Sequence, residues 1–262
     1  MSLATLRWKL ADGIAWITLA RPSRMNVLDR EVLTELKSVL SEVRRDDHVR
    51  LVVLEGEGKA FCAGGDVERF HGEIDRAPAY VGDLVKHFHD TIGEMLAMPK
   101  PILASVGGVV AGGGMGLFLA ADLAVASESA SFVMAYSGIG ASPDGGTSFF
   151  LPRIVGLRRA MELTLTNRRL SAREAWEWGL VNEVVPDTEL AAATDRLARR
   201  LADGPTRAYA QARALLRQSF SHGPIEQMDD EGRRLVDMSG TADFRAGVAA
   251  FTQKRRPTFS GS

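Results

Sequence analysis

Two glycine-rich stretches are places where the backbone itself could do chemistry. They read GKAFCAGGDV over residues 58–67 and VAGGGMGLFLAADLAVAS over residues 110–127. In each stretch a strand is expected to end, small residues turn the chain, and a helix begins. Glycine lets a ligand approach the backbone closely, and a helix N-terminus offers unpaired N–H donors at the positive end of the helix dipole. Two such loops facing each other would hold an anionic oxygen between two N–H groups, as an oxyanion hole does.

The spacing of these glycines excludes several better-known motifs. The sequence contains no G-x-x-x-x-G-K-[ST] phosphate loop, no G-x-G-x-x-G dinucleotide fingerprint and no G-x-S-x-G nucleophile turn. Two interpretations remain for each loop. It binds an anionic oxygen, or its glycines merely permit a tight turn and close helix packing.

Three side chains are further candidates for chemistry. Asp144 lies among small and apolar residues in IGASPDGGTSFF, directly before an expected helix, so it is either a helix N-cap or a partly buried carboxylate base. Tyr136 has an ordinary pKa of about 10, which suits it to donating a hydrogen bond or lining a pocket rather than to acting as a base. His89 has helical spacing with apolar residues and is expected to face the core. His87 lies two residues away on another face, so the two form no metal pair.

The composition excludes several function classes. The chain has 262 residues with 32 basic and 33 acidic side chains, and this near-neutral balance argues against nucleic-acid binding. The single cysteine, Cys62, excludes an intrachain disulfide and a cysteine-built zinc site, and no metal site is expected. No apolar stretch approaches the roughly 18 residues of a membrane span. These features favour a cytoplasmic protein that acts on a soluble small molecule.

Strand and helix patterns alternate through the first two thirds of the chain. Asp12-Gly13 predicts a hairpin turn between two strands, and Asp29 predicts the cap of a helix whose apolar residues recur about every 3.6 positions. The alternation favours an α/β fold with parallel strand pairing. After about residue 187 only helical patterns remain. We therefore expect a core over residues 1–195 and a helical region over residues 196–262.

The expected helices near the end of the chain carry more apolar surface than they could bury among themselves. Their apolar faces include Leu190, Leu197, Leu201, Leu215, Leu216, Leu235, Val236 and Met238. An exposed apolar patch of more than a few hundred Å² usually marks an interface. The sequence therefore predicts an oligomer.

Five segments carry a resemblance to a known enzyme family. They read GKAFCAGGDV, KPILASVGGVVAGGGMGLFLAADLAVAS, SFVMAYSGIGASPDGG, RRLSAREAWEWGLVNEVV and AGVAAFTQKRRPTF. In order and spacing, from about Leu6 to Phe259, the chain resembles the enoyl-CoA hydratase/isomerase (crotonase) superfamily. The resemblance implies an α/β crotonase (ClpP-like) spiral of ββα units with a C-terminal helical trimerisation region, assembled as a homotrimer or hexamer.

The resemblance also implies a substrate and the residues that bind it. The substrate is an acyl-CoA thioester whose carbonyl oxygen lies between the N–H groups of Gly65 and Gly113, and coenzyme A is part of the substrate rather than a separate cofactor. The positions that line the CoA or meet its phosphates correspond here to Arg24, Ala63, Gly64, Asp66, Val67, Lys254 and Arg255. Among these, Arg24 is equally compatible with a solvated loop charge.

Two missing glutamates narrow the reaction that the resemblance implies. Hydratases of this superfamily orient one water with two glutamates, at positions that are Gly116 and Tyr136 here. The matched carboxylate that remains is Asp144. It corresponds to the acid/base of ring-1,2-epoxyphenylacetyl-CoA isomerases and to the nucleophile of 4-chlorobenzoyl-CoA dehalogenases. An acyl-CoA isomerase with Asp144 as its single acid/base is the favoured hypothesis.

Three alternatives stay open. A dehalogenase-like hydrolase fits His89, which lies at the histidine position of that enzyme, although two of its cage tryptophans correspond here to Phe88 and Tyr136. A weakly active hydratase is the second, and an RNA-binding or non-catalytic superfamily member is the third. The near-neutral charge argues against RNA. The sequence does not predict the acyl group, because residues 70–80, which are expected to cover the pocket, show no readable pattern.

Overall fold

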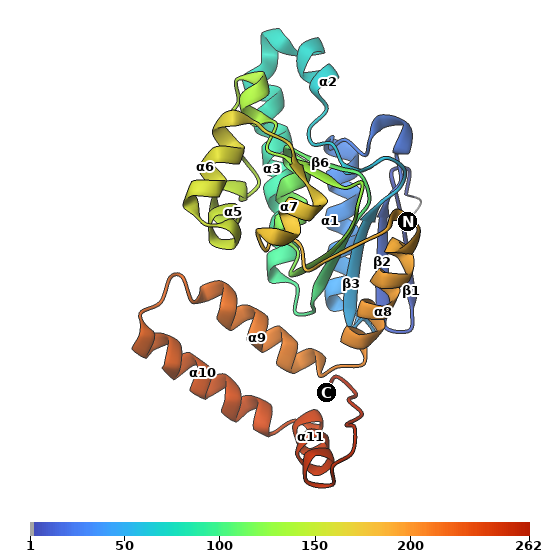
Figure 1. Ribbon diagram of the computed structural model, residues 1–262, viewed down its shortest axis with the longest axis vertical. Coiled ribbons are helices and arrows are strands. Elements are labelled where there is room, and N and C mark those ends of the chain that lie inside the picture. The colour runs from blue at the N-terminus through green and yellow to red at the C-terminus, as the bar shows by residue number, and fades with distance from the viewer. Residues whose placement is uncertain (1–2) are drawn as a thin grey trace.

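The computed structural model describes residues 3–262, which form an α/β core and a set of helices that extends from it (Figure 1). The main sheet has six strands in the order β1-β2-β3-β5-β7-β10. The first two form the hairpin predicted at Asp12-Gly13, and every later neighbour pairs in parallel. The strands are β1 (Leu6–Ala11), β2 (Ile14–Leu19), β3 (Leu51–Gly56), β5 (Ile102–Val106), β7 (Leu123–Ser127) and β10 (Glu183–Val185).

A second sheet of four strands, in the order β4-β6-β8-β9, continues from the first. Its strands are β4 (Ala60–Cys62), β6 (Val109–Ala111), β8 (Ser131–Val133) and β9 (Leu170–Ser171). The chain passes from β3 to β4, from β5 to β6 and from β7 to β8 through short turns, so successive strand pairs stack in parallel as a spiral. No sequence pattern predicts β6, β9 or β10, because two or three residues are too few to show an alternation.

Helices bury both faces of the main sheet. In β3, Val52 and Leu54 pack toward α1 (Arg30–Arg45) and α3 (Ala77–Ala97), whereas Leu51 and Val53 pack toward α8 (Leu190–Ala202). Burial on both faces explains why these strands read as continuous apolar runs. The predicted cap of α1 is confirmed, since the Val32 N–H donates to the Asp29 side chain at 3.0 Å.

The core extends further along the chain than expected. The boundary expected between residues 195 and 196 lies inside α8, which packs on the main sheet as one helix. Leu190, Leu197 and Leu201 face that sheet, so the expectation that they form a free apolar face is wrong. Beyond α8 lie α9 (Thr206–Gln218), α10 (Pro224–Ser239) and α11 (Ala242–Thr252), which we call the helical arm (Figure 1).

Hydrogen bonds and ion pairs fix the helical arm to the core. Arg213 and Arg217 of α9 pair with Asp122 at 2.7 and 2.8 Å. Arg50 donates to the Thr206 hydroxyl and to the Phe259 carbonyl, at 3.1 and 3.0 Å. The remaining α-helices of the described residues are α2 (Val67–Gly72), α4 (Gly113–Ala120), α5 (Thr147–Val155), α6 (Leu157–Thr166) and α7 (Ala172–Glu177).

Candidate active site

The two glycine-rich loops lie side by side. One follows β4, and the other leads from β6 into α4. A Cβ atom built on Gly64 would lie 3.2 Å from the backbone nitrogen of Gly113, and one built on Gly112 would lie 3.8 Å from the Cα atom of Gly64. The structure therefore brings the two loops together through their backbones, as the sequence suggested.

Each glycine of the triplet has a different reason for being glycine. Gly112 has φ 50° and ψ −121°, a conformation that other residues rarely adopt. A Cβ atom on Gly114 would lie 2.2 Å from the carbonyl oxygen of Cys62, at the end of β4. A Cβ atom on Gly113 would lie 3.1 Å from the Leu28 Cδ1, and because Gly113 is the first residue of α4, its N–H has no partner within the helix.

The two glycines that are predicted to supply N–H donors are partly exposed. Gly65 and Gly113 are intermediate in burial, whereas their neighbours Gly64 and Gly114 are buried. Within residues 3–262, neither the Gly65 N–H nor the Gly113 N–H donates to a backbone carbonyl in a turn, loop or cap. An oxyanion hole needs two N–H donors that point at one oxygen, and each of the two contacting loops carries one candidate.

Asp144 and His89 form a hydrogen-bonded pair. The Asp144 Oδ1 lies 2.6 Å from the His89 Nε2, and the side chains are 29% and 54% exposed. The interpretation of Asp144 as an N-cap is wrong, because α5 starts at Thr147 behind Gly146 with no side-chain cap. The expectation that His89 faces the core is also wrong, since its ring lies at the surface beside Asp144.

The loop that carries Asp144 is held through its backbone. The Asp144 carbonyl accepts hydrogen bonds from the Thr147 hydroxyl at 2.9 Å and from the Tyr136 hydroxyl at 3.3 Å. Burial raises the pKa of Tyr136 above its ordinary value, and the nearby Asp144 charge raises it further. The phenol therefore stays protonated as a donor. Tyr136 positions the Asp144 loop and is not a base.

Gly116 lies in α4 directly against the Asp144 loop. A Cβ atom on Gly116 would lie 2.8 Å from the Phe88 ring and 2.9 Å from the Gly145 carbonyl oxygen. The Phe88 ring also lies 3.7 Å from the Cβ position of Gly113. Phe88 therefore fills the space between α3, α4 and the Asp144 loop, and no side chain extends from position 116 unless that loop moves. Sequence analysis assigns no role to Gly145, because its contacts with Phe88 and Gly116 join separate segments of the chain.

The predicted CoA-lining residues that follow β4 form one continuous segment with Gly65, and the last of them, Val67, is the first residue of α2. Within it, Asp66 is buried, pairs with Arg24 at 2.5 Å and accepts a hydrogen bond from the Arg69 N–H at 3.2 Å. Arg24 and Asp66 were expected to contact CoA separately, and the structure pairs them with each other. The Arg24 side chain is still 45% exposed, so its remaining N–H groups are free to meet a phosphate.

Lys254 and Arg255 lie away from these loops in the same chain. Both follow the end of α11, at the end of the molecule opposite α2, which directly follows the Gly65 loop (Figure 1). They are exposed, and Lys254 has a left-handed φ of 53°. The structure therefore does not bring these two residues together with Gly65 and Gly113 within one chain.

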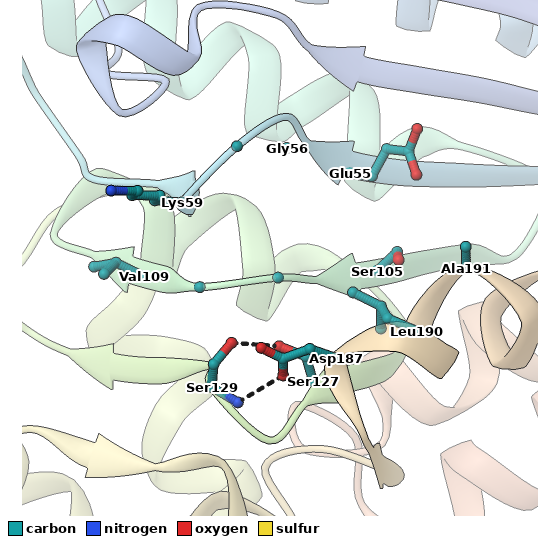
Figure 2. Close-up of a pocket in the computed structure, with 13 residues that line it drawn as sticks. Glu55, Gly56, Lys59, Ser105, Val109, Ser127, Ser129, Asp187, Leu190 and Ala191 are labelled. Atoms are coloured by element: carbon teal, nitrogen blue, oxygen red, sulfur yellow. Dashed lines mark hydrogen bonds between the residues drawn. The ribbon is translucent and has the colours of Figure 1, made fainter.

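Two cavities lie apart from the predicted residues. One, of about 530 Å³, lies where the strands pass between the two sheets (Figure 2). There the Ser129 N–H donates to Asp187 at 3.0 Å and the Ser127 and Ser129 hydroxyls lie 3.1 Å apart, so these polar groups already bond one another. The other cavity, of about 600 Å³, lies between α1, α2 and α3. None of the predicted site residues lines either cavity.

Other kinds of site receive no support from the described part of the chain. Residues 3–262 hold no cluster of three or more His, Cys, Asp or Glu side chains that could bind a metal ion. Burial raises the pKa of the Cys62 thiol to about 12, so it is not a nucleophile. Within the same residues, no helix is long and apolar enough to cross a membrane.

Comparison with known proteins decides the family. The family model described as enoyl-CoA hydratase/isomerase matches residues 9–262. The chain belongs to the enoyl-CoA hydratase/isomerase family. Its resemblance to this family and its crotonase fold are therefore confirmed. A solved enoyl-CoA hydratase/isomerase from Cupriavidus metallidurans superposes with a TM-score of 0.93 at 33% identity, covering 100% of this chain and 98% of the other.

Relatives within the enoyl-CoA hydratase/isomerase family carry different activities. The 1,2-epoxyphenylacetyl-CoA isomerase of Escherichia coli is 39% identical over 254 residues, which are 95% of each chain. The 4-chlorobenzoyl coenzyme A dehalogenase-2 of an Arthrobacter species is 37% identical over 250 residues, which are 93% of this chain and 88% of the relative. These two sequence identities are too similar to indicate which of the two reactions this chain catalyses. The geometry of the candidate site is therefore needed to choose between them.

Proposed function

We propose that this family member is an acyl-CoA isomerase, which shifts a double bond or rearranges a ring close to the thioester of its substrate. The observation that carries the proposal is the position of Asp144. Its carboxylate caps no helix, contacts His89 and lies on a loop that packs against α4 at Gly116. One carboxylate beside two backbone N–H donors is suited to moving one proton on a thioester enolate.

The proton shuttle uses Asp144 twice. With a 3-enoyl thioester, the carboxylate removes a proton from C2, and the electron pair of that C–H bond enters a dienolate. The negative charge develops on the thioester oxygen, which accepts hydrogen bonds from Gly65 and Gly113. The protonated Asp144 then gives its proton to C4, and the double bond comes to lie between C2 and C3. Proton and electrons balance without a further reactant.

The same geometry disfavours hydration. Hydration of a 2-enoyl thioester needs acid/base groups that hold and split a water molecule, and the two matched positions are Gly116 and Tyr136. Packing of Phe88 and Gly145 leaves no room for a carboxylate at position 116. Tyr136 is held protonated by burial, and its hydroxyl is already bonded to the Asp144 carbonyl.

The direct test is a comparison of two substrates. We expect the purified protein to convert a 3-enoyl-CoA to its 2-enoyl isomer, and to add water to a 2-enoyl-CoA at least about a hundredfold more slowly, because one aligned acid/base group contributes about 10²–10⁴ in rate. Chromatography of the CoA products gives both initial rates. Hydration as fast as isomerisation would contradict the proposal.

A second candidate function is favoured by the contact of His89 with Asp144. In a dehalogenase-like reaction, Asp144 attacks the ring carbon that bears chlorine, chloride leaves, and an aryl ester of Asp144 forms. Water then attacks the ester carbonyl, and a base beside Asp144 takes the proton of that water. The bond between the carbonyl carbon and the aryl oxygen breaks, the ring leaves as the hydroxyl product with that proton, and the Asp144 carboxylate is restored. His89, with its Nε2 2.6 Å from Oδ1, is placed to be this base. Against this candidate, the substrate ring would meet Phe88 and Tyr136 where the dehalogenase resemblance calls for tryptophans.

The helical arm supports the proposal of an oligomer. Leu216, Leu235 and Val236 are 71%, 65% and 70% exposed, and Phe251 is 85% exposed. So many exposed apolar side chains on three neighbouring helices are typical of an interface. We expect a trimer or hexamer by light scattering at micromolar concentration, in which Lys254 and Arg255 reach the CoA of a neighbouring subunit. A monomer under these conditions contradicts the assembly and leaves those two residues without a role in CoA binding.

CoA alone is expected to stabilise the protein. The loops that carry Gly65 and Gly113 contact each other through their own backbones, so we expect the CoA site to form without the acyl group. A ligand at a hundredfold excess over its dissociation constant adds about 2.7 kcal/mol to the free energy of unfolding. Thermal denaturation with millimolar CoA should therefore show a clear rise in Tm. No rise with CoA or with acetyl-CoA would count against binding at these loops.

A further inference from the structure

The loop between β2 and α1 contains unusual backbone. Met25 and Asn26 are consecutive, neither is glycine, and both have a left-handed φ of 53°. Such conformations are uncommon outside glycine and persist where the surroundings hold them in place. Asn26 is only 2% exposed, so its side chain and backbone are both enclosed by the fold.

The Asn26 side-chain amide is fully bonded. Its oxygen accepts from the Arg21 N–H at 2.9 Å. Its nitrogen donates to the Glu57 carbonyl at 3.0 Å and to the Ala60 carbonyl at 2.8 Å. An asparagine amide offers two N–H donors, and both are used here. Since Glu57 and Ala60 bracket the turn into β4, Asn26 ties its own loop to the start of that strand.

The same loop is also tied to the residues that follow β4. The Ala63 N–H donates to the Met25 carbonyl at 3.0 Å, and the Leu28 N–H donates to the Gly64 carbonyl at 2.7 Å. The Asp66 N–H donates back to the Leu28 carbonyl at 3.2 Å. These bonds involve the residues on both sides of Gly65, and among residues 3–262 the Gly65 N–H itself donates to no backbone acceptor. Residues 25–28 therefore form a frame around the Gly65 peptide.

We propose that Asn26 is a positioning residue for the Gly65 N–H donor. Its amide fixes the left-handed turn, the turn places the backbone of Met25 and Leu28, and these set the direction of the Gly65 peptide. Asn26 touches no substrate in this proposal, which rests on the proposed role of Gly65 as a thioester oxygen donor. Loss of one oxyanion donor lowers the rate by about 10²–10³. A donor that is displaced rather than lost should lower it by about 10–100-fold.

Asn26→Gly is the decisive variant. Glycine adopts a φ of 53° without steric cost, so the substitution removes the amide and leaves the turn conformation allowed. Asp12→Gly is the matched control. Asp12 also has a left-handed φ, of 52°, but lies in the exposed β1–β2 hairpin outside this frame. If Asn26→Gly does not accumulate as folded protein, Asn26→Ser takes its place. The serine hydroxyl keeps one hydrogen-bond donor for the Glu57 and Ala60 carbonyls, which the Asn26 amide bonds with two.

Two readouts separate positioning from mere stability. We expect Asn26→Gly to lower the isomerisation kcat about 10–100-fold with KM within about threefold of the parent, and Asn26→Ser to lower kcat less. The second readout is the infrared C=O stretch of a ¹³C-labelled saturated acyl-CoA bound to the protein. Hydrogen bonding lowers this frequency, so it should shift down on the parent and on Asp12→Gly, and return toward the free value on Asn26→Gly.

The outcomes are distinguishable. A lower Tm for Asn26→Gly with parental kcat and parental C=O frequency would show a structural role only and overturn the proposal. A parent that shows no C=O shift with bound thioester would overturn the oxyanion role of Gly65, and with it the role of Asn26. A C=O shift in the parent without isomerisation would contradict the proposed reaction alone, and the frequency of the variant would then still decide the role of Asn26.

Discussion

Asp144→Asn should lower the isomerisation kcat by about 10²–10⁴ while the dissociation constant for CoA stays within about threefold of the parent. Asparagine has nearly the same shape as aspartate but cannot take a proton from C2 or return one to C4. The groups that bind the thioester oxygen are backbone N–H groups of Gly65 and Gly113, which the substitution does not touch. Initial rates with a 3-enoyl-CoA, together with calorimetry of CoA binding, measure the two effects separately.

Asp203→Asn is the matched control for this variant. Asp203 is exposed just after α8, away from the Asp144 loop, so the same chemical change there should leave kcat unaltered. An Asp144→Asn protein that isomerises as fast as the parent would mean that Asp144 only shapes its loop. Equal losses in kcat and CoA affinity would instead indicate that the substitution disturbs the binding site as a whole.

Gly114→Ala should have the second large effect, on stability and rate together. The new Cβ atom would lie 2.2 Å from the Cys62 carbonyl oxygen and 2.9 Å from its carbonyl carbon. Backbone atoms cannot rotate away as a flexible side chain can, so α4 must move off β4. Overpacking of this kind costs typically about 1–3 kcal/mol of unfolding free energy. The shift carries the adjacent Gly113 N–H with it, and a displacement of about 1 Å costs roughly 10²-fold in rate.

Gly93→Ala controls for the change of glycine to alanine within a helix. Gly93 is exposed in α3, and nothing lies within 4 Å of the Cβ position. Alanine there should raise the unfolding free energy by up to about 1 kcal/mol without changing kcat. Urea denaturation and initial rates on both variants make the comparison. A Gly114→Ala protein as stable and as active as the parent would show that α4 does not need this close approach to β4.

The parts of the fold that the sequence predicts are those governed by local signals. The Asp12-Gly13 hairpin and the Asp29 cap of α1 depend on residues within a few positions of each other. The packing of α8 does not depend on such local signals. An apolar face on a helix indicates that another surface covers it, but it does not indicate which surface that is. The pattern of Leu190, Leu197 and Leu201 therefore predicts an interface between subunits, although the main sheet of the same chain covers these residues.

The candidate site divides in the same way. The glycine loops were predictable because a strand, small residues and a helix follow one another in sequence. The pairing of His89 with Asp144 joins residues 55 positions apart, and helical spacing alone placed His89 toward the core. Phe88 and Gly145 leave no room for a side chain at position 116, and this packing likewise depends on contact between three separate segments of the chain. Such non-local contacts decide which reaction the site favours, and no single stretch of sequence contains them.

The central claim is that Asp144 moves a proton and does not attack the substrate. One competition experiment tests it: the parent protein is mixed with equal amounts of a 3-enoyl-CoA and 4-chlorobenzoyl-CoA, and products and intact protein mass are followed together. The account predicts formation of the 2-enoyl-CoA, no chloride release and an unchanged protein mass. Chloride release with a transient mass increase that maps to Asp144, and an untouched 3-enoyl-CoA, would contradict it and make Asp144 a nucleophile.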